Sequence, residues 1–234
     1  MKTRHKNNER QVTRVFKNVF KKYDFMNDIM SLGIHRIWKK DFINLLNPQK
    51  GTKLIDVASG TGDIAKLFLK QTNYTGNVYC VDENKGMLEI NKKKLKYKNK
   101  VKWYCNNAEK LPFKNNEFDY YTISFGIRNV ENINNTLAEA FRVLKPGGRF
   151  LCLEFSKVEN EIFTAFYKTY SKAIPKIGEI IIGNSEPYEY LINSINEFYT
   201  QKEMLNFLKK KNFSNVTYKN LSGGIVAIYS GWKI

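Results

Sequence analysis

The chain has 234 residues, of which 42% are hydrophobic and 26% charged, which is ordinary for one globular domain with a sizeable core. The net charge of +17 is compatible with a nucleic acid, an anionic membrane or an acidic partner, although solvated surface lysines are the simpler explanation. No long uncharged apolar stretch is present, so neither secretion nor a membrane-spanning helix is expected.

The N-terminal region, residues 1–48, is predicted to form a helical cover. Apolar residues recur at helical spacing within residues 11–22 and again after Gly33. The second apolar face consists of Ile34, Ile37, Trp38, Phe42 and Leu45. Between these two segments, residues 23–31 mix polar with apolar side chains. That mixture fits either helix capping and solvation or a lid over a pocket.

From residue 52 the sequence alternates between strand and helix patterns. Strands are predicted over residues 53–57, 77–81, 101–105, 118–124 and 149–155, and helices over 63–70, 85–96 and 132–144. Because consecutive strands are joined by helices, the pattern indicates a mostly parallel sheet with helices on both faces.

The last third of the chain departs from this alternation. Residues 156–199 are predicted to form a helical insertion on the substrate side. No linker and no internal repeat is visible, so the chain, residues 1–234, is predicted to be a single domain.

The C-terminal segment is predicted to complete the sheet. A helix over residues 201–211 begins at a capping box formed by Thr200 and Glu203. Two final strands, residues 215–220 and 224–230, are predicted to form an antiparallel hairpin. The total is therefore seven strands.

The stretch KLIDVASGTGD, residues 53–63, is the strongest local signal for a ligand site. A buried strand breaks at Gly60, Thr61 and Gly62, and a helix begins at Asp63. The glycines allow a sharp turn and a close approach of the backbone to a ligand. On its own, this turn is compatible with NAD, with S-adenosylmethionine or with no ligand.

Two further loops favour a ligand that carries adenosine. Asp82 ends the second strand about 20 residues later, where a carboxylate can accept hydrogen bonds from a ribose diol. Asn107 and Ala108 follow the third strand and are placed to meet a base. A carboxylate at Asp63 would repel a pyrophosphate but not a sulfonium ligand with an ammonium group. These features favour S-adenosylmethionine over NAD.

Other residue types add little to this prediction. Cys80, Cys105 and Cys152 lie in apolar, strand-like runs without CxxC spacing, so reduced thiols that pack as small hydrophobes are expected. The two histidines, His5 and His35, have no cysteine near them, so no metal site is predicted.

Several motifs are together typical of one family. Two are diagnostic, YDFMNDIMSLGIHRIWK (residues 23–39) and ISFGIRNV (123–130), while DVASGTGD (56–63) and RVLKPGG (142–148) occur across many methyltransferases. The chain resembles the UbiE-type ubiquinone/menaquinone biosynthesis C-methyltransferases over nearly its whole length. One departure is Ser59, where the family often has glycine; serine is small, so the turn is expected to survive.

This resemblance implies a Rossmann-like class I methyltransferase with S-adenosylmethionine as its cofactor. The cofactor contacts that it implies are Thr61, Asp82, Asn107, Ala108 and Ser124. It also implies methylation of a ring carbon of a polyprenyl benzoquinol, such as 2-methoxy-6-polyprenyl-1,4-benzoquinol, or of demethylmenaquinol.

The expected chemistry needs a phenolate, because a neutral aromatic carbon is a poor nucleophile. Arg128 is predicted to stabilise the phenolate or to polarise a water, and Asn129 to orient the hydroxyl or that water. Asp63 is a candidate for accepting the proton through the water. The alternative for Arg128 is a structural salt bridge with an acid such as Glu131.

Two more candidates come from the N-terminal cover. Tyr23 lies in its lid-like segment and is included among the candidate catalytic residues. His35 is an alternative base, because the ordinary pKa of histidine suits neutral pH. A capping or structural role for His35 after Gly33 explains its position as well.

The isoprenoid tail of such a substrate suggests a peripheral site on a membrane. Basic residues that would meet an anionic leaflet are Lys17, Lys21, Lys22, Lys39 and Lys40. The expected location is the cytoplasm, at the inner face of a membrane, or the matrix side in a mitochondrion. A homodimer or a quinone-synthesis complex is compatible with the resemblance, and no nucleic-acid partner is expected. The alternatives are an RNA methyltransferase and a non-catalytic scaffold protein.

Overall fold

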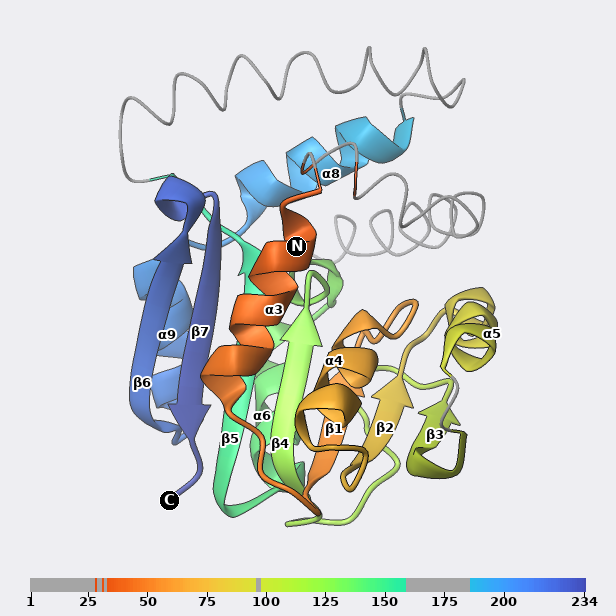
Figure 1. The fold of residues 1–234 in the computed structure, drawn as a ribbon. Helices are drawn as coiled ribbons and strands as arrows, with labels where there is room; N and C mark the ends of the chain where they lie inside the picture. The colour runs from red at the N-terminus through yellow and green to blue at the C-terminus, as the bar shows by residue number, and fades with distance from the viewer. Residues whose placement is uncertain (1–27, 29–30, 32, 96–97, 159–185) are drawn as a thin grey trace.

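The computed structural model of the protein describes residues 28, 31, 33–95, 98–158 and 186–234 (Figure 1). Within them lies one seven-stranded sheet with the order β3-β2-β1-β4-β5-β7-β6. The strands are β1 (Lys53–Val57), β2 (Asn77–Val81), β3 (Val101–Tyr104), β4 (Phe118–Ser124), β5 (Leu144–Phe155), β6 (Ser214–Leu221) and β7 (Val226–Trp232).

The strand directions confirm the predicted sheet. Strands β1 to β5 pair in parallel, and β7 pairs antiparallel with both β5 and β6. β5 is longer than predicted because Leu144 already pairs with Phe118, before the Pro-Gly-Gly segment. The C-terminal hairpin is confirmed, and it places β7 between β5 and β6.

Helices cover both faces of the sheet, as predicted (Figure 1). On one face lie α3 (His35–Leu46), α4 (Asp63–Gln71) and α5 (Lys85–Lys94). On the other face lie α6 (Ile133–Val143) and α9 (Gln201–Lys210). The short 3-10 helices are η2 (Lys98–Lys100), η3 (Ile127–Asn129) and η4 (Ser222–Gly224).

The helix α8 (Glu186–Glu197) takes a different position from the other helices. It lies across the carboxyl ends of the parallel strands rather than along a face of the sheet (Figure 1). The predicted helix over residues 11–22 falls outside the described residues. Among the described helices, none is long and apolar enough to cross a membrane.

Burial on both faces follows from the strand sequences. Ile55 and Val57 of β1 point to the face with α6 and α9, whereas Leu54 points to the face with α3 and α4. Successive side chains of a strand alternate between faces, so an apolar run is required wherever both faces are covered. Asp56 interrupts this run.

The apolar face predicted for α3 is partly wrong. Trp38 and Phe42 are buried, but Ile34 and Ile37 are 39% and 59% exposed. The buried stripe instead recurs every three to four residues from His35, at Trp38, Lys39, Phe42, Ile43 and Leu46. The indole Nε1 of Trp38 donates a hydrogen bond to Ser222 Oγ at 2.9 Å, which fixes α3 against the C-terminal hairpin connection.

The cysteine prediction holds for two of the three residues. Cys80 and Cys152 are buried within the sheet, and the three thiols are free. Cys105 is exposed, because β3 ends one residue earlier, at Tyr104.

The glycine turn is supported from behind by α5. Gly60 and Gly62 have φ angles of +50° and +88°, which favour glycine. The buried Asn91 side chain donates from Nδ2 to the Gly60 carbonyl at 3.3 Å and accepts from Trp103 Nε1 at 3.0 Å. The turn survives Ser59, whose carbonyl accepts from Gly62 N at 3.0 Å.

We expect Gly62→Ala to destabilise the protein much more than Gly147→Ala. Both positions have a positive φ, so both substitutions carry backbone strain of about 1–2 kcal/mol. A Cβ at position 62 would also lie 2.6 Å from Asn91 Oδ1, whereas position 147 has no atom within 4 Å. Urea unfolding should therefore show an extra loss of about 2 kcal/mol for Gly62→Ala. Equal midpoints for the two variants would contradict this steric role of Asn91.

Candidate cofactor and substrate site

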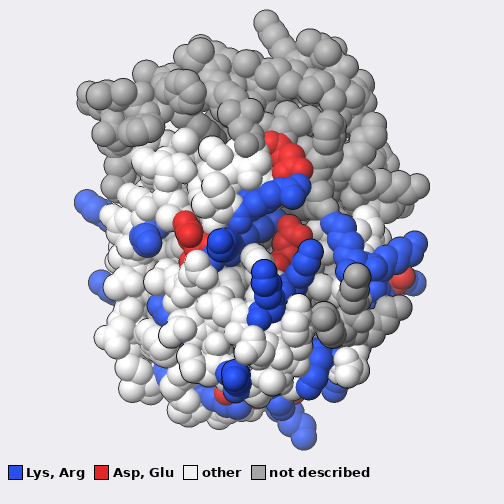
Figure 2. Space-filling view, viewed as in Figure 1, with Lys and Arg blue, Asp and Glu red and all other residues white. Residues whose placement is uncertain are grey.

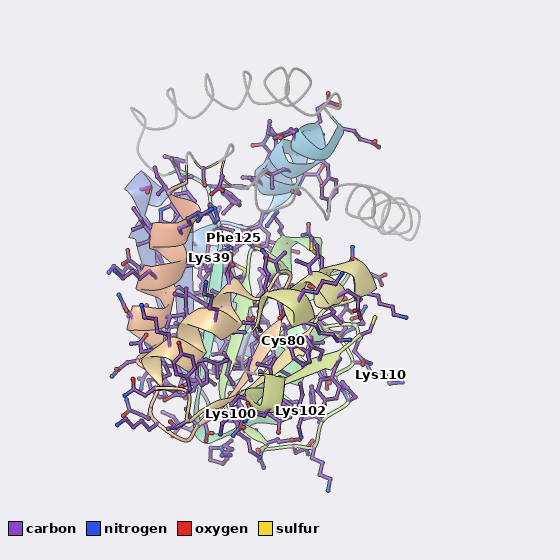
Figure 3. All side chains as sticks on the ribbon, turned by 45° about the vertical axis from the view of Figure 1, so that its right-hand side comes forward. Lys39, Cys80, Lys100, Lys102, Lys110 and Phe125 are labelled. Carbon is purple, nitrogen blue, oxygen red and sulfur yellow. The ribbon has the colours of Figure 1, made fainter. Side chains whose placement is uncertain are left out.

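The predicted cofactor residues all lie at one edge of the sheet. The glycine turn follows β1, Asp82 follows β2, Asn107 and Ala108 follow β3, and Ser124 ends β4. Ligands of doubly wound sheets bind beyond the carboxyl ends of parallel strands. Figure 3 shows Lys39 and Phe125 at this same edge, with Cys80 deeper in the sheet.

Asp82 is held in a fixed orientation by two backbone donors. Its Oδ2 accepts from Gly60 N and its Oδ1 from Asn84 N, both at 2.8 Å. Burial raises the pKa of Asp82, and these two hydrogen bonds oppose that rise. A carboxylate accepts up to about four hydrogen bonds, so each oxygen can still accept from a ribose hydroxyl.

Asp56 is a candidate site residue that the sequence analysis missed. It is 1% exposed; its Oδ1 accepts from Thr122 Oγ1 at 2.8 Å, while its Oδ2 has no partner among the described residues. Burial raises the pKa of Asp56 to about 7, with a smaller contribution from the nearby Asp82 charge. The available signal was a lone carboxyl group inside the apolar run LIDV. Because buried polar atoms without a partner are rare, Asp56 Oδ2 is a candidate contact for a ligand.

Asp63 forms an ion pair with Lys39 of α3. The Lys39 Nζ lies 2.7 Å from Asp63 Oδ2, and the side chains are 11% and 37% exposed. Burial alone would raise the pKa of Asp63, but the Lys39 charge and hydrogen bond outweigh it and lower the pKa. Asp63 is therefore a weak proton acceptor. Lys39 was predicted to face a membrane; that prediction is wrong, because its ammonium group turns towards the glycine turn.

Together, Asp56, Asp63 and Asp82 form an acidic cluster around the glycine turn. Lys39 is the cation that offsets both Asp56 and Asp63. Space for a Cβ at Gly60 is open to 4 Å, so a ligand can approach the backbone there. An excess of carboxyl groups disfavours a pyrophosphate and suits a ligand with positive charge.

Hydroxyl and amide groups complete this edge. The buried Oγ atoms of Ser59 and Ser124 have no hydrogen-bond partner among the described residues. Asn107 uses its Oδ1 to accept from Glu109 N at 2.6 Å, which shapes the loop after β3. The half-buried Ala108 follows it in that loop and packs against the core. These groups fit the polar parts of a nucleoside ligand.

Arg128 occupies a buried ion pair beside this edge. Its Nη1 lies 2.7 Å from Glu154 Oε1, and the two side chains are 4% and 0% exposed. Nη1 also donates to the Phe125 carbonyl at 2.7 Å, and Nε donates to Ser194 Oγ of α8 at 3.3 Å. The structural alternative thus exists, but with Glu154 as the partner instead of Glu131. Burial raises the pKa of Glu154, and Arg128 opposes that rise.

Asn129 connects the same loop to α8. Its Oδ1 accepts from the Tyr190 Oη at 2.9 Å, and burial raises the pKa of Tyr190 to about 12. Tyr190 therefore stays protonated as a donor at neutral pH. Sequence reasoning missed Tyr190 and Glu154, which lie in the stretches YEYLINSI (residues 188–195) and LEFS (153–156). Asp63 thus lies beside the glycine turn with Lys39, whereas Arg128 and Asn129 lie in η3, after β4.

His35 begins α3 one turn before Lys39. Its Nε2 lies 2.8 Å from Asp28 Oδ1, and its buried Nδ1 has no partner among the described residues. Burial lowers the pKa of His35, and the Asp28 hydrogen bond opposes that change. Asp28 is held in turn by Arg36 at 2.6 Å. Tyr23 falls outside the described residues.

Comparisons with known proteins identify the family of this chain. The model of the ubiE/COQ5 methyltransferase family matches residues 4–233. The chain is 52% identical to the ubiquinone/menaquinone biosynthesis C-methyltransferase UbiE of Rickettsia akari, covering 95% of this chain and 92% of that protein. It is 45% identical to the mitochondrial 2-methoxy-6-polyprenyl-1,4-benzoquinol methylase of Bos taurus, covering 96% of this chain and 79% of that protein.

Solved structures support the fold. A SAM-dependent methyltransferase from Aquifex aeolicus superposes with a TM-score of 0.62 at 16% identity, covering 84% of this chain and 89% of that one. The acidic cluster, the open glycine turn and the fixed Asp82 fit S-adenosylmethionine. The chain belongs to the ubiE/COQ5 methyltransferase family and is an S-adenosylmethionine-dependent methyltransferase.

Proposed function

We propose that this enzyme methylates a ring carbon of a polyprenyl benzoquinol of the 2-methoxy-6-polyprenyl-1,4-benzoquinol type, or of demethylmenaquinol. The observation that carries this proposal is the 52% identity, over 95% of the chain, to an enzyme named for ubiquinone and menaquinone biosynthesis. An RNA methyltransferase and a non-catalytic scaffold were the alternatives, and the near full-length match to named quinone enzymes favours neither.

The reaction sets clear demands on the protein. Bound S-adenosylmethionine supplies an electrophilic methyl group on a positively charged sulfur. The ring carbon gains this methyl group and loses its own proton, and the quinol hydroxyl is restored. The chain must therefore remove the hydroxyl proton to make the ring carbon nucleophilic, and it must hold that carbon in line with the methyl group.

His35 fits the role of general base better than Asp63. The lowered pKa of Asp63 makes it a weak acceptor, and Lys39 already donates to it. His35 has a lowered pKa and is neutral at pH 7, with Asp28 bound to Nε2 and no described partner at Nδ1. That arrangement leaves a lone pair at Nδ1 for the proton.

Arg128 and Asn129 are proposed to act on the quinol oxygen from the other side. The charge of Arg128 is shared with Glu154, so its effect on a phenolate is weaker than that of an isolated guanidinium. Its hydrogen bonds also fix the loop that carries Asn129 beneath α8. We infer that Arg128 both stabilises negative charge and positions Asn129.

The function is tested with the purified protein, labelled S-adenosylmethionine and a short-tailed demethyl benzoquinol. Label is expected in the quinol and not in an equal mass of tRNA, because the proposed nucleophile is a phenolate carbon. His35→Gln should keep cofactor binding and lower turnover by about 100-fold or more, the contribution typical of a general base. Label in tRNA, or in neither substrate, would contradict the proposed function.

The same assay separates the two roles of Arg128. Arg128→Met alone leaves Glu154 buried and unpaired, which costs about 3–5 kcal/mol of stability. The double variant Arg128→Met with Glu154→Met removes both charges and should recover most of that loss. If it folds, binds cofactor and still methylates at the normal rate, Arg128 has no role in stabilising the phenolate.

Asp56→Asn should stabilise the protein without ligand at pH 8 and not at pH 4. The pKa of Asp56 rises from 3.8 to about 7 on folding, so the folded state holds the extra proton and loses stability as pH rises between these values. Removing the carboxyl group removes a cost on the order of 2–4 kcal/mol at pH 8. Thermal unfolding measures this difference; a variant that is less stable at pH 8 would refute it.

The same substitution is expected to weaken cofactor binding at pH 8. Wild-type affinity should fall as pH drops below 7, because protonated Asp56 no longer attracts a cationic ligand. The affinity of Asp56→Asn should stay flat over that range. Calorimetric titration at several pH values provides the measurement.

We also propose peripheral association with an anionic membrane, at the inner face in a bacterium or the matrix side in a mitochondrion. The exposed Ile34 and Ile37 of α3 lie beside the exposed Arg36 and Lys40. Figure 2 shows Lys and Arg side chains gathered over α3 and α4 on this face. Flotation with anionic liposomes at low salt should capture the protein, and 0.5 M salt should release about all of it. No capture at low salt would oppose this proposal.

A further inference from the structure

Lys39 is a buried ammonium group with spare hydrogen-bond donors. It lies on α3 with 11% of its side chain exposed, and among the described residues its one hydrogen-bond acceptor is Asp63 Oδ2 at 2.7 Å. An ammonium group carries three N–H donors. Two donors therefore remain for other acceptors, and a largely buried donor without an acceptor is costly.

The side chains around Lys39 lie beside the glycine turn. Asp63 is the first residue of α4, directly after Gly62. On the same side lie His35, one turn earlier on α3, and Asp56, whose Oδ2 has no described partner. Lys39 and Asp63 thus place one positive and one negative group next to each other beside the glycine turn, whose backbone is open to a ligand at Gly60.

The amino-acid end of S-adenosylmethionine has the matching pattern. Its α-ammonium and α-carboxylate are separated by a single carbon, so a ligand of this kind needs a cation and an anion side by side. We propose that Lys39 binds the α-carboxylate of the cofactor while Asp63 binds its α-ammonium group. This inference rests on the cofactor and not on the proposed quinol substrate.

A purely structural explanation for Lys39 is a tether between α3 and α4. Such a tether would make the packing of α3 depend on Lys39, but it would not distinguish a ligand that has a carboxylate from one that lacks it. Charge-assisted hydrogen bonds contribute about 1.5–3 kcal/mol, equivalent to about a tenfold to hundredfold change in affinity. Ligand chemistry therefore separates the two explanations.

The test is calorimetric titration of the full chain with S-adenosylhomocysteine and with its decarboxylated analogue, which keeps the amino group. Lys39→Met should weaken binding of S-adenosylhomocysteine by about tenfold or more and binding of the analogue by less than about threefold. Lys40→Met is the matched control: it removes the same charge from the next, exposed residue and should change neither affinity. Asp63→Asn should weaken both ligands, because both carry the ammonium group.

Equal losses for the two ligands in Lys39→Met, or no loss for either, would overturn the proposal. Lys39→Arg should recover the preference for the carboxylate ligand, which a tether does not predict. If Lys39→Met fails to fold, the wild-type protein still decides the question. It should bind the decarboxylated analogue at least about tenfold more weakly, and equal affinities would overturn the proposal. No quinol is present in these titrations, so failure of the proposed function leaves their outcome interpretable.

Discussion

Buried charge at the carboxyl ends of the parallel strands is the constraint on which the site depends. The sheet brings Asp56 and Asp82 to one edge, and α4 adds Asp63. Isolated carboxylates in such a place would be costly, so each is compensated. Thr122 donates to Asp56, backbone N–H groups hold Asp82, and Lys39 pairs with Asp63. The compensation is incomplete at Asp56, and a cationic ligand can supply the rest.

The buried ion pair between Arg128 and Glu154 has a different role from the carboxyl groups around the glycine turn. Arg128 and Glu154 join the loop after β4 to the end of β5, and Ser194 and Tyr190 extend that connection to α8. A buried pair needs good geometry and further hydrogen bonds to offset desolvation, and Arg128 has both. Because α8 lies over the carboxyl edge of the sheet, these contacts fix the position of α8 relative to the loops at that edge.

The sequence predicted the sheet and the glycine turn after β1 well, because both are local patterns. Strand periodicity located β1, β2 and β4 within their observed bounds, and glycine spacing located the turn. Pairings between distant segments were not predictable. Nothing in the region around Lys39 signals that its partner is Asp63, and the Arg128 partner was sought in the neighbouring Glu131 instead of in β5. The predicted apolar face of α3 wrongly included Ile34 and Ile37, because apolar residues at the start of a helix need not face the core.

The acidic cluster also has a consequence for the release of product. S-adenosylmethionine carries one net positive charge, whereas S-adenosylhomocysteine is neutral overall, so methyl transfer discharges the ligand within its own binding site. In the proposed site, the acidic cluster then loses its attraction to the sulfonium charge, while Asp63 keeps its proposed contact with the α-ammonium group, which the product retains. A negatively charged site therefore attracts S-adenosylmethionine more strongly than S-adenosylhomocysteine. This difference favours the replacement of the product by a new cofactor molecule.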